Sequence, residues 1–367
     1  MLIGVPKEIK DNEFRVSLVP QGVKELKAHG HEVIVEKSAG VGSGISDDEY
    51  KEAGASIVNA SEAWQADIVI KVKEPQEAEF KYFRKGLLLF TFLHLAANRK
   101  VAEALVESKV TSVAYETLEY VDEENRRILP ILKPMSEVAG RVGVLEGCHY
   151  LCKPYGGVGV LAGGIEGVEN ASIVILGGGH VGENASEVAV GTGADVTMID
   201  ISDERLKYYD KKFSGKVKTV KSTAENIENA VKNCDMLVGA VHVPGERTPF
   251  LVPKELVAKM KKGSVIVDVA VDQGGSVETT RPTTHSDPVF TYEGVIHYCV
   301  SNMPGAVPRT STFALTKASL PYLLGMANDG LDFITKDPYR KKGINTLDGK
   351  VVNEAVAKTL GMEYSDI

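Results

Sequence analysis

Short apolar runs alternate with helix-forming stretches along almost the whole chain. In the first part, apolar or alternating runs predict strands at residues 2–5, 31–37, 67–73, 86–92 and 110–116. Helix signals separate some of them: Pro20 opens one helix that Gly30 ends, and Ser46 with Glu49 forms the capping-box pattern that starts another. Alternation of this kind predicts a mostly parallel sheet with helices on both faces.

A second series of the same kind begins after Pro134. Residues 135–151 predict a long helix, although glycines within it weaken that interpretation. A glycine-rich loop at 156–167 follows, and strands are then expected in the segments ASIVIL, DVTMID, KVKTV, MLVGAV and SVIVDVA. The chain closes with an apolar-striped segment over 311–328 and a tail that is expected to be polar and helical.

The two series predict an α/β protein of two doubly wound domains with a cleft between them. The chain is expected to leave the first domain near Pro130 and to return to it near Pro308. The first domain would therefore be discontinuous, comprising residues 1–130 and 309–367, and the second would comprise residues 131–308.

The strongest local motif lies in the second domain, in ASIVILGGGHVGENASEVAVGTGADVTMID. An apolar strand runs directly into Gly177, Gly179 and Gly182 at GxGxxG spacing, and a helix and a strand ending in Asp200 follow. Such glycines suit a tight turn, the approach of a pyrophosphate and close helix packing, while the helix N-terminus offers N–H groups to phosphate. An acid such as Asp200 can accept hydrogen bonds from the adenosine ribose. The combination predicts a Rossmann dinucleotide site; the alternative is a structural turn beside a surface aspartate.

Asp200 also indicates which dinucleotide is bound. Its carboxylate would repel a 2′-phosphate, so NAD is favoured over NADP. Arg205 keeps an alternative open, because its side chain could turn toward the 2′ position or face outward on its helix.

Composition narrows the class of partners. The 367 residues include 42 Lys and Arg against 50 Asp and Glu, a net charge of −8 that argues against a nucleic-acid or membrane-surface partner. The N-terminus turns charged by Lys7, unlike a signal peptide, and no apolar run approaches the roughly 20 residues that span a bilayer. Cysteines are too sparse for a disulfide scaffold, and Cys148 and Cys152 lack the further ligands of a structural metal site. We therefore expect a cytoplasmic protein without a metal.

Isolated basic residues of the first domain occupy unusual positions. Arg15 precedes an apolar, strand-like stretch, Lys73 ends the predicted strand 67–73, and His94 follows the apolar run LLLFTFL. Ligands bind at the carboxyl ends of strands in doubly wound sheets, so Lys73 and His94 stand at functional positions. The alternatives are a solvated lysine and a histidine satisfied within the core.

A series of longer motifs extends over roughly residues 3–325. In chain order they are IGVPKEIKDNEFRVSLVP, KVKEP, TFLHLAA, YETLE, PMSEVAGR, LGGGHVG, VDVAVDQGG, RPTT and VSNMPGAVPRTSTFALT. Together they resemble the L-alanine dehydrogenase family. This resemblance implies reversible oxidative deamination of L-alanine to pyruvate and ammonium with NAD as hydride acceptor, in a homohexamer.

The resemblance also implies residue roles. Arg15 and Lys73 match the residues that bind the substrate carboxylate, His94 matches the acid/base histidine, and Asp272 matches the second catalytic residue. Beside the glycines of the loop, the residues matched to cofactor binding are Ser136, His180, Val181, Asp200, Arg205, Ser222, Val241, His242, Val269, Ala270, Val271, Asp272, Arg281, Val300, Ser301, Asn302 and Met303.

These residue types suit the implied chemistry. Arg15 as a planar fork and Lys73 as a point charge can hold a carboxylate. A histidine changes its protonation near neutral pH, so His94 could take a proton from the ammonium and later activate water. Asp272 could order that water or stabilise the iminium, and its role stays open.

Four further residues are candidates around the substrate and the cofactor. Glu116 and Asn302 could orient the reacting groups, and Met135 could contact a methyl group or belong to the packing. His242 departs from the family, in which this position is usually aliphatic, and could make NAD affinity depend on pH.

Three other functions remain as alternatives. A transhydrogenase subunit that binds NAD(H) shares the early KE…RV motif and the Rossmann unit, and a saccharopine-type dehydrogenase has a related architecture. The intact HLAA, DQGG and MSEVAGR motifs favour alanine dehydrogenase over both. A non-catalytic NAD sensor would have no need of Arg15, Lys73, His94 and Asp272 together.

Overall fold

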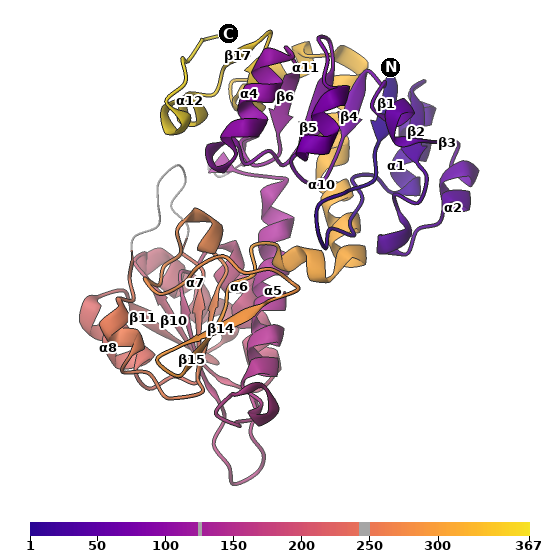
Figure 1. Cartoon of the computed structure of the whole chain (residues 1–367). Coiled ribbons are helices and arrows are strands. Elements are labelled where there is room, and N and C mark those ends of the chain that lie inside the picture. The colour runs from indigo at the N-terminus through magenta and orange to yellow at the C-terminus, as the bar shows by residue number, and fades with distance from the viewer. Residues whose placement is uncertain (124–126, 242–249) are drawn as a thin grey trace. The chain divides into compact units, whose positions relative to one another are not determined.

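The chain folds into two compact units, which the computed structural model describes over residues 1–123, 127–241 and 250–367 (Figure 1). Unit 1 comprises Met1–Met135 with Val307–Ile367, and unit 2 comprises Ser136–Ala306. Within the described residues no helix is both long enough and apolar enough to cross a membrane.

Unit 1 is built on a sheet of order β17-β16-β6-β5-β4-β1-β2-β3. The six strands from β1 to β6 pair in parallel, and β16 and β17 add an antiparallel edge. The strands are β1 (Leu2–Val5), β2 (Glu32–Glu36), β3 (Ser56–Val58), β4 (Ile68–Ile70), β5 (Leu88–Thr91), β6 (Thr111–Ala114), β16 (Ile344–Leu347) and β17 (Lys350–Val351). The α-helices are α1 (Pro20–Ala28), α2 (Asp47–Glu52), α3 (Ala60–Ala63), α4 (Arg99–Glu107), α10 (Pro308–Asp329), α11 (Asp332–Thr335) and α12 (Glu354–Leu360). A separate short hairpin joins β7 (Tyr120–Val121) and β8 (Arg127–Ile128).

Unit 2 is built on a sheet of order β11-β10-β9-β12-β13-β15-β14, in which β14 is antiparallel to β15 and the other pairs are parallel. The strands are β9 (Ser172–Leu176), β10 (Asp195–Asp200), β11 (Val217–Lys221), β12 (Met236–Gly239), β13 (Val265–Asp268), β14 (Val289–Tyr292) and β15 (Val295–Tyr298). The helices are α5 (Leu132–Tyr150), which begins in unit 1, α6 (His180–Gly191), α7 (Asp203–Phe213), α8 (Ala224–Val231) and α9 (Lys254–Val257). The predicted class, two α/β units with mainly parallel sheets, is confirmed.

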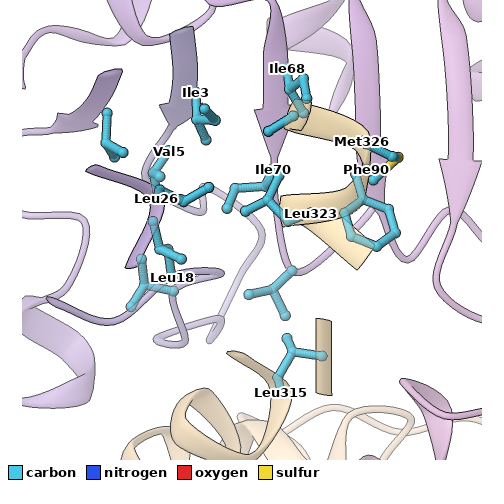
Figure 2. Close-up of a cluster of buried hydrophobic side chains, with 14 of the residues drawn as sticks. Ile3, Val5, Leu18, Leu26, Ile68, Ile70, Phe90, Leu315, Leu323 and Met326 are labelled. Atoms are coloured by element: carbon cyan, nitrogen blue, oxygen red, sulfur yellow. The ribbon is translucent and has the colours of Figure 1, made fainter. Parts of the chain in front are cut away.

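The core of unit 1 follows from the alternation of side chains along its strands. Ile3 and Val5 of β1 and Ile68 and Ile70 of β4 share one face, where α1 and α10 cover them (Figure 2). Intervening residues such as Val69 point to the other face, toward a second cluster with α4 and α12. Both faces of the sheet are therefore buried, as the near-continuous apolar strands require.

The apolar stretch after Arg15 is not a strand, which corrects the sequence-based interpretation. Residues 16–19 are buried yet irregular. Side chains take over the backbone bonding that a neighbouring strand would have supplied: Thr312 Oγ1 of α10 accepts from Val16 N at 3.1 Å, and Tyr50 Oη donates to Leu18 O at 2.6 Å. These partners lie far away in the chain, so the local pattern could not reveal them.

The C-terminal tail also differs from its prediction, because it contains strands β16 and β17 between its helices. Asp348 and Gly349 connect them, with φ of 48° and 82°. Asp-Gly with both residues at positive φ is a typical two-residue hairpin turn, so the sequence INTLDGKVV carried a signal for this hairpin.

Helix α5 persists although glycines interrupt its sequence. A Cβ on Gly140 would lie 2.2 Å from Val181 O of α6, and a Cβ on Gly147 would lie 2.6 Å from the side chain of Met236 in β12. The glycines therefore allow α5 to approach α6 and the sheet closely, and packing outweighs their weak helix propensity.

Replacing Gly140 by Ala is expected to destabilise unit 2 by about 1–3 kcal/mol, because the added methyl group would meet main-chain atoms that cannot rotate away. Thermal unfolding followed by circular dichroism measures the change. The control is Gly191→Ala at the end of α6, where nothing lies within 4 Å of the added carbon. This control should be neutral or stabilising by up to about 1 kcal/mol, and an equal loss in both variants would contradict the packing argument.

Candidate active site

The order of strands reverses beside the first strand of each sheet. In unit 1, β1 lies between β2 and β4, and in unit 2, β9 lies between β10 and β12. Loops that leave the carboxyl ends of such neighbouring strands diverge, and ligands bind between them in doubly wound sheets. Arg15 follows β1, Lys73 follows β4, and the glycine loop follows β9. His94 and Asp272 follow the next strands outward, β5 and β13.

Arg15 lies on the loop that follows β1 and is 2% exposed. Its guanidinium forms a two-pronged ion pair with Glu13, with Nε to Oε1 at 2.7 Å and Nη2 to Oε2 at 2.6 Å. Nη1 approaches Met135 Sδ at 3.3 Å. The structure thus brings Arg15 and Met135 together and adds Glu13, whose role the sequence analysis missed.

Lys73 lies beyond the end of β4, which stops at Ile70 and not at Lys73 as predicted. The side chain is buried, and its ammonium group makes no hydrogen bond or ion pair with any residue in the described ranges. Burial, followed by the positive charges of Arg15 and Lys10, lowers the pKa of Lys73. A buried cation without a partner is energetically unfavourable, so this site is suited to an anionic ligand.

The strand ends early because Glu8 captures the backbone that follows it. Glu8 Oε1 accepts from Val72 N at 2.6 Å and from Lys73 N at 3.4 Å. The other carboxylate oxygen of Glu8 pairs with Lys71 Nζ at 3.0 Å, and Glu79 pairs with the same ammonium at 2.9 Å.

These three charges, Glu8, Lys71 and Glu79, form a buried triad. Burial alone would lower the pKa of Lys71, but the two carboxylates outweigh it and raise that pKa. Sequence analysis missed the triad, although a lysine inside the apolar run DIVIKVK is a signal that a buried anion must lie nearby.

Glu74 follows Lys73 and is also buried. Burial raises its pKa, but the ion pair with Lys10 at 2.5 Å, together with Lys73 and His94, lowers it further, so that the net shift is downward. Its second oxygen, Oε2, is buried and has no hydrogen-bond partner among the described residues. Glu74 also lines a cavity of about 300 Å³ between the loop after β4 and the start of α4.

His94 follows β5 and adopts a left-handed backbone conformation, with φ of 47° and ψ of 40°. Glu116, which follows β6, holds this turn because its Oε1 accepts from His94 N at 2.6 Å and both its oxygens accept from Leu93 N at 3.2 Å. The imidazole stacks on Phe92 with ring centres 5.6 Å apart. Glu116 therefore orients His94 through the main chain.

The glycine loop of unit 2 has the geometry that a pyrophosphate site needs. Gly177 has φ of 98°, and a Cβ there would lie 2.9 Å from main-chain atoms of Ala240 and Val241. A Cβ on Gly182 would lie 1.9 Å from Gly177 O, whereas the space around Gly179 is open within 4 Å. The open side at Gly179 precedes the N-terminus of α6, which lacks a side-chain cap. These residues fit a dinucleotide phosphate.

Asp200 ends β10 beside this loop. Its Oδ2 accepts from Gly178 N at 2.6 Å, and its Oδ1 accepts from Ser202 N at 2.7 Å. Ser222, which directly follows the neighbouring strand β11, donates its N–H to Asp200 O at 2.9 Å. Arg205 donates from Nε to Gly178 O at 2.7 Å, so its side chain turns toward the glycine loop and does not face outward.

The loop that carries Asp272 is organised by Asp268, which the sequence analysis missed. Asp268 ends β13, is fully buried and accepts from Ala270 N at 3.0 Å, Ser276 N at 3.1 Å and Thr280 Oγ1 at 2.9 Å. Burial raises its pKa to about 6, although these hydrogen bonds oppose the shift. Asp272 itself is exposed.

The other residues matched to the cofactor take various positions in unit 2. Arg281 is exposed and lies with its guanidinium 4.4 Å from the ring centre of Phe290, and His285 Nε2 lies 2.8 Å from Asn302 O. His242 lies outside the described residues. Buried members are Val271, Val300 and Met303; half-buried members are Ser136, Val181, Val241, Val269, Ala270, Ser301 and Asn302; His180 is exposed at the start of α6.

Parallel sheets of this order, a fitted glycine loop and an acid at the end of the second strand define the class of dinucleotide-binding α/β oxidoreductases. Two family models match the chain: "Alanine dehydrogenase/PNT, N-terminal domain" over residues 4–139 and "Alanine dehydrogenase/PNT, C-terminal domain" over residues 143–354. The chain belongs to the alanine dehydrogenase/PNT family, which confirms the resemblance of its motifs.

Individual proteins agree with this assignment. An alanine dehydrogenase of Staphylococcus saprophyticus is 51% identical over 370 residues, which cover 100% of this chain and 99% of that protein. A solved structure of L-alanine dehydrogenase is similar with a TM-score of 0.94 and 49% identity, covering 98% of this chain and 99% of that one. A transhydrogenase from Sinorhizobium meliloti is similar with a TM-score of 0.81 and 26% identity, covering 97% and 100%.

Replacing Lys71 by Met is expected to destabilise unit 1 by about 3–5 kcal/mol, because Glu8 and Glu79 would remain buried without their cation. The matched control is Lys73→Met on the same segment, which removes a buried charge that has no ion-pair partner in the described part of the chain. Lys73→Met should change stability by less than about 1 kcal/mol or increase it. Thermal unfolding compares the two variants, and similar losses would refute the distinction between the lysines.

Proposed function

We propose that this chain catalyses the reversible oxidative deamination of L-alanine to pyruvate and ammonium, with NAD as the hydride acceptor. The observation that carries the proposal is the buried ammonium of Lys73 beside Arg15, a pair of cations suited to a small carboxylate. The alanine dehydrogenases that match this chain over nearly its full length support the substrate.

Arg15 and Lys73 would bind the substrate carboxylate together. Glu13 already engages Nε and Nη2 of Arg15 and so fixes the plane of the guanidinium. Lys73 would complete the anion site as a point charge. The substrate carboxylate would then be the negative partner that the ammonium of Lys73 lacks among the described residues. Met135, next to Arg15, would contact the small methyl side chain.

His94 would act as the acid/base group. It would take a proton from the substrate ammonium, so that the hydride can leave Cα for the cofactor. After releasing this proton to solvent, it would take a proton from the water that adds to the iminium carbon and pass it to the amine nitrogen. Ammonia would then leave as the C–N bond breaks, the carbonyl forms and the hydroxyl proton returns to His94. The hydrogen bonds from Glu116 hold the backbone of His94 in the conformation that presents its ring. Asp272 and Asn302 would order the water and the substrate amine.

NAD would bind to unit 2 and supplies the hydride acceptor when bound. The glycine loop would hold the pyrophosphate, Asp200 would accept from the ribose hydroxyls, and residues 269–272 and 300–303 would line the nicotinamide end. A homohexamer in the cytoplasm is part of the proposal and rests on the family resemblance and on the acidic composition.

The function is tested by following NADH absorbance with pyruvate and ammonium together and with each alone. We expect oxidation of NADH that requires both compounds and that prefers pyruvate among 2-oxo acids.

Replacing His94 by Ala should lower turnover by more than about a hundredfold, the usual contribution of an acid/base group, while NADH still binds. Tight NADH binding without any ammonium-dependent turnover would reject the proposal and favour a transhydrogenase-type subunit or a sensor.

The lowered pKa of Lys73 predicts how substrate binding depends on pH. The ammonium attracts a carboxylate only while it is protonated, so the KM for pyruvate should be constant at lower pH and rise as pH passes through a value below the ordinary 10.5. Lys73→Arg should abolish this rise, because a guanidinium stays protonated throughout. The assay holds free ammonia constant across the pH series. An unchanged rise in Lys73→Arg would assign the titration to another group.

A further inference from the structure

Glu183 collects several donors beside the glycine loop of unit 2. It lies in the first turn of α6, and its carboxylate accepts from Arg205 Nη2 at 3.0 Å, from Tyr208 Oη at 2.7 Å and from Lys212 Nζ. Burial raises the pKa of Glu183, but these three donors outweigh it and lower that pKa to about 2. The carboxylate is therefore charged throughout the range in which proteins are stable.

This ion pair determines where the guanidinium of Arg205 lies. Nε and Nη2 of Arg205 both donate to Gly178 O, and Nη2 also reaches Glu183. The flat face of the guanidinium packs over Tyr208, whose ring centre lies 4.5 Å from Cζ. Arg205 is thus tied by a main-chain oxygen, a carboxylate and an aromatic ring at the same time.

Asp200 and Arg205 both form hydrogen bonds with the main chain of Gly178. Asp200 accepts from Gly178 N, and Arg205 donates to Gly178 O. The salt-bridge partner of Arg205 in the described part of the chain is Glu183 rather than Asp200. A cation therefore lies beside the acid that would bind the ribose, but a second acid neutralises it.

We infer that Glu183 is a specificity-determining residue for the cofactor: by binding Arg205 it withholds the guanidinium from the 2′ position of the adenosine ribose. The inference rests on the proposed use of NAD. An arginine near the end of the second strand is the group that accommodates the 2′-phosphate in NADP-binding domains of this fold. Two acids, Asp200 by repulsion and Glu183 through Arg205, would then exclude NADP.

Because the two acids act in different ways, removing one charge and removing both should have different effects on NADPH binding. Removing the charge of Asp200 alone takes away the repulsion of the 2′-phosphate but leaves Arg205 paired with Glu183. Removing the charge of Glu183 as well frees the guanidinium to turn toward a phosphate, with which it can form a two-pronged, charge-assisted contact.

The chain offers a matched control in Glu187, one turn further along α6. Glu187 pairs with Lys212 at 2.6 Å and with Arg141, and among the described residues the ion-pair partner of Arg205 is Glu183. Glu187→Gln therefore removes the same charge from the same helix and disturbs the same lysine, while it leaves the Glu183–Arg205 pair in place.

The experiment measures dissociation constants of NADPH and NADH by nicotinamide fluorescence, with the full chain and no substrate. In an Asp200→Ser background, Glu183→Gln is expected to strengthen NADPH binding by about tenfold beyond Glu187→Gln, the effect of one charge-assisted hydrogen bond. Adding Arg205→Leu should cancel this gain, because the gain depends on the guanidinium.

The outcomes separate the inference from the proposed function. The inference would be overturned if Glu183→Gln and Glu187→Gln had equal effects on NADPH binding, or if the gain persisted with Arg205→Leu. NADH binding by the unchanged chain would still support the proposed cofactor in either case. Failure of the unchanged chain to bind NADH would overturn both. Glu183→Asp keeps the charge and should keep the low NADPH affinity, which separates loss of the carboxylate from damage to α6.

Discussion

The reversal of strand order beside the first strand of each sheet is the constraint on which both candidate sites depend. At β1 and at β9 the chain crosses first to one side and later to the other, so the loops at the carboxyl edge diverge. Main-chain groups there lose the regular ladder, and each buried one needs another partner. Glu8 and Glu116 supply that partner for the segments that carry Lys73 and His94. Two acids thus stabilise the irregular main chain at the carboxyl edge of the sheet in unit 1.

The two buried lysines of the segment KVKEP show how the same residue type can serve structure and chemistry. The charge of Lys71 is compensated by two carboxylates. Lys71 is a fixed part of the fold, because removing either the lysine or the carboxylates would leave the other charges buried without a partner. Lys73 lies two positions on, and burial lowers its pKa. The ammonium of Lys73 has no ion-pair partner among the described residues, and an anion bound there would offset the cost of burying it, which is why the proposed function assigns the substrate carboxylate to Lys73.

Local patterns predicted the parts of the structure that local forces determine. The glycine loop and Asp200 could be placed from sequence because their spacing reflects contacts between elements adjacent in the chain. The irregular segment 16–19 could not, because its partners come from α10 near the other end of the chain. Glu13 and Glu183 were missed for a related reason: a charged residue near a motif carries no sign of which cation it will meet. Roles matched by family resemblance, such as that of Asp272, still require the proposed measurements.

The two units share the reversal of strand order but present different groups at the carboxyl edge, and the ligands of the proposed function account for the difference. A pyrophosphate has several oxygens and can be held by main-chain N–H groups, so the edge of unit 2 requires glycines that let the backbone approach. A small carboxylate offers two oxygens, and its affinity must come from charge, which Arg15 and Lys73 would supply in the proposed function. Glu13 orients the guanidinium of Arg15, and Glu8 holds the main chain at Lys73. In unit 2 charges gather beside the glycine loop: Asp200 accepts from Gly178 N, Arg205 donates to Gly178 O, and Glu183 pairs with Arg205.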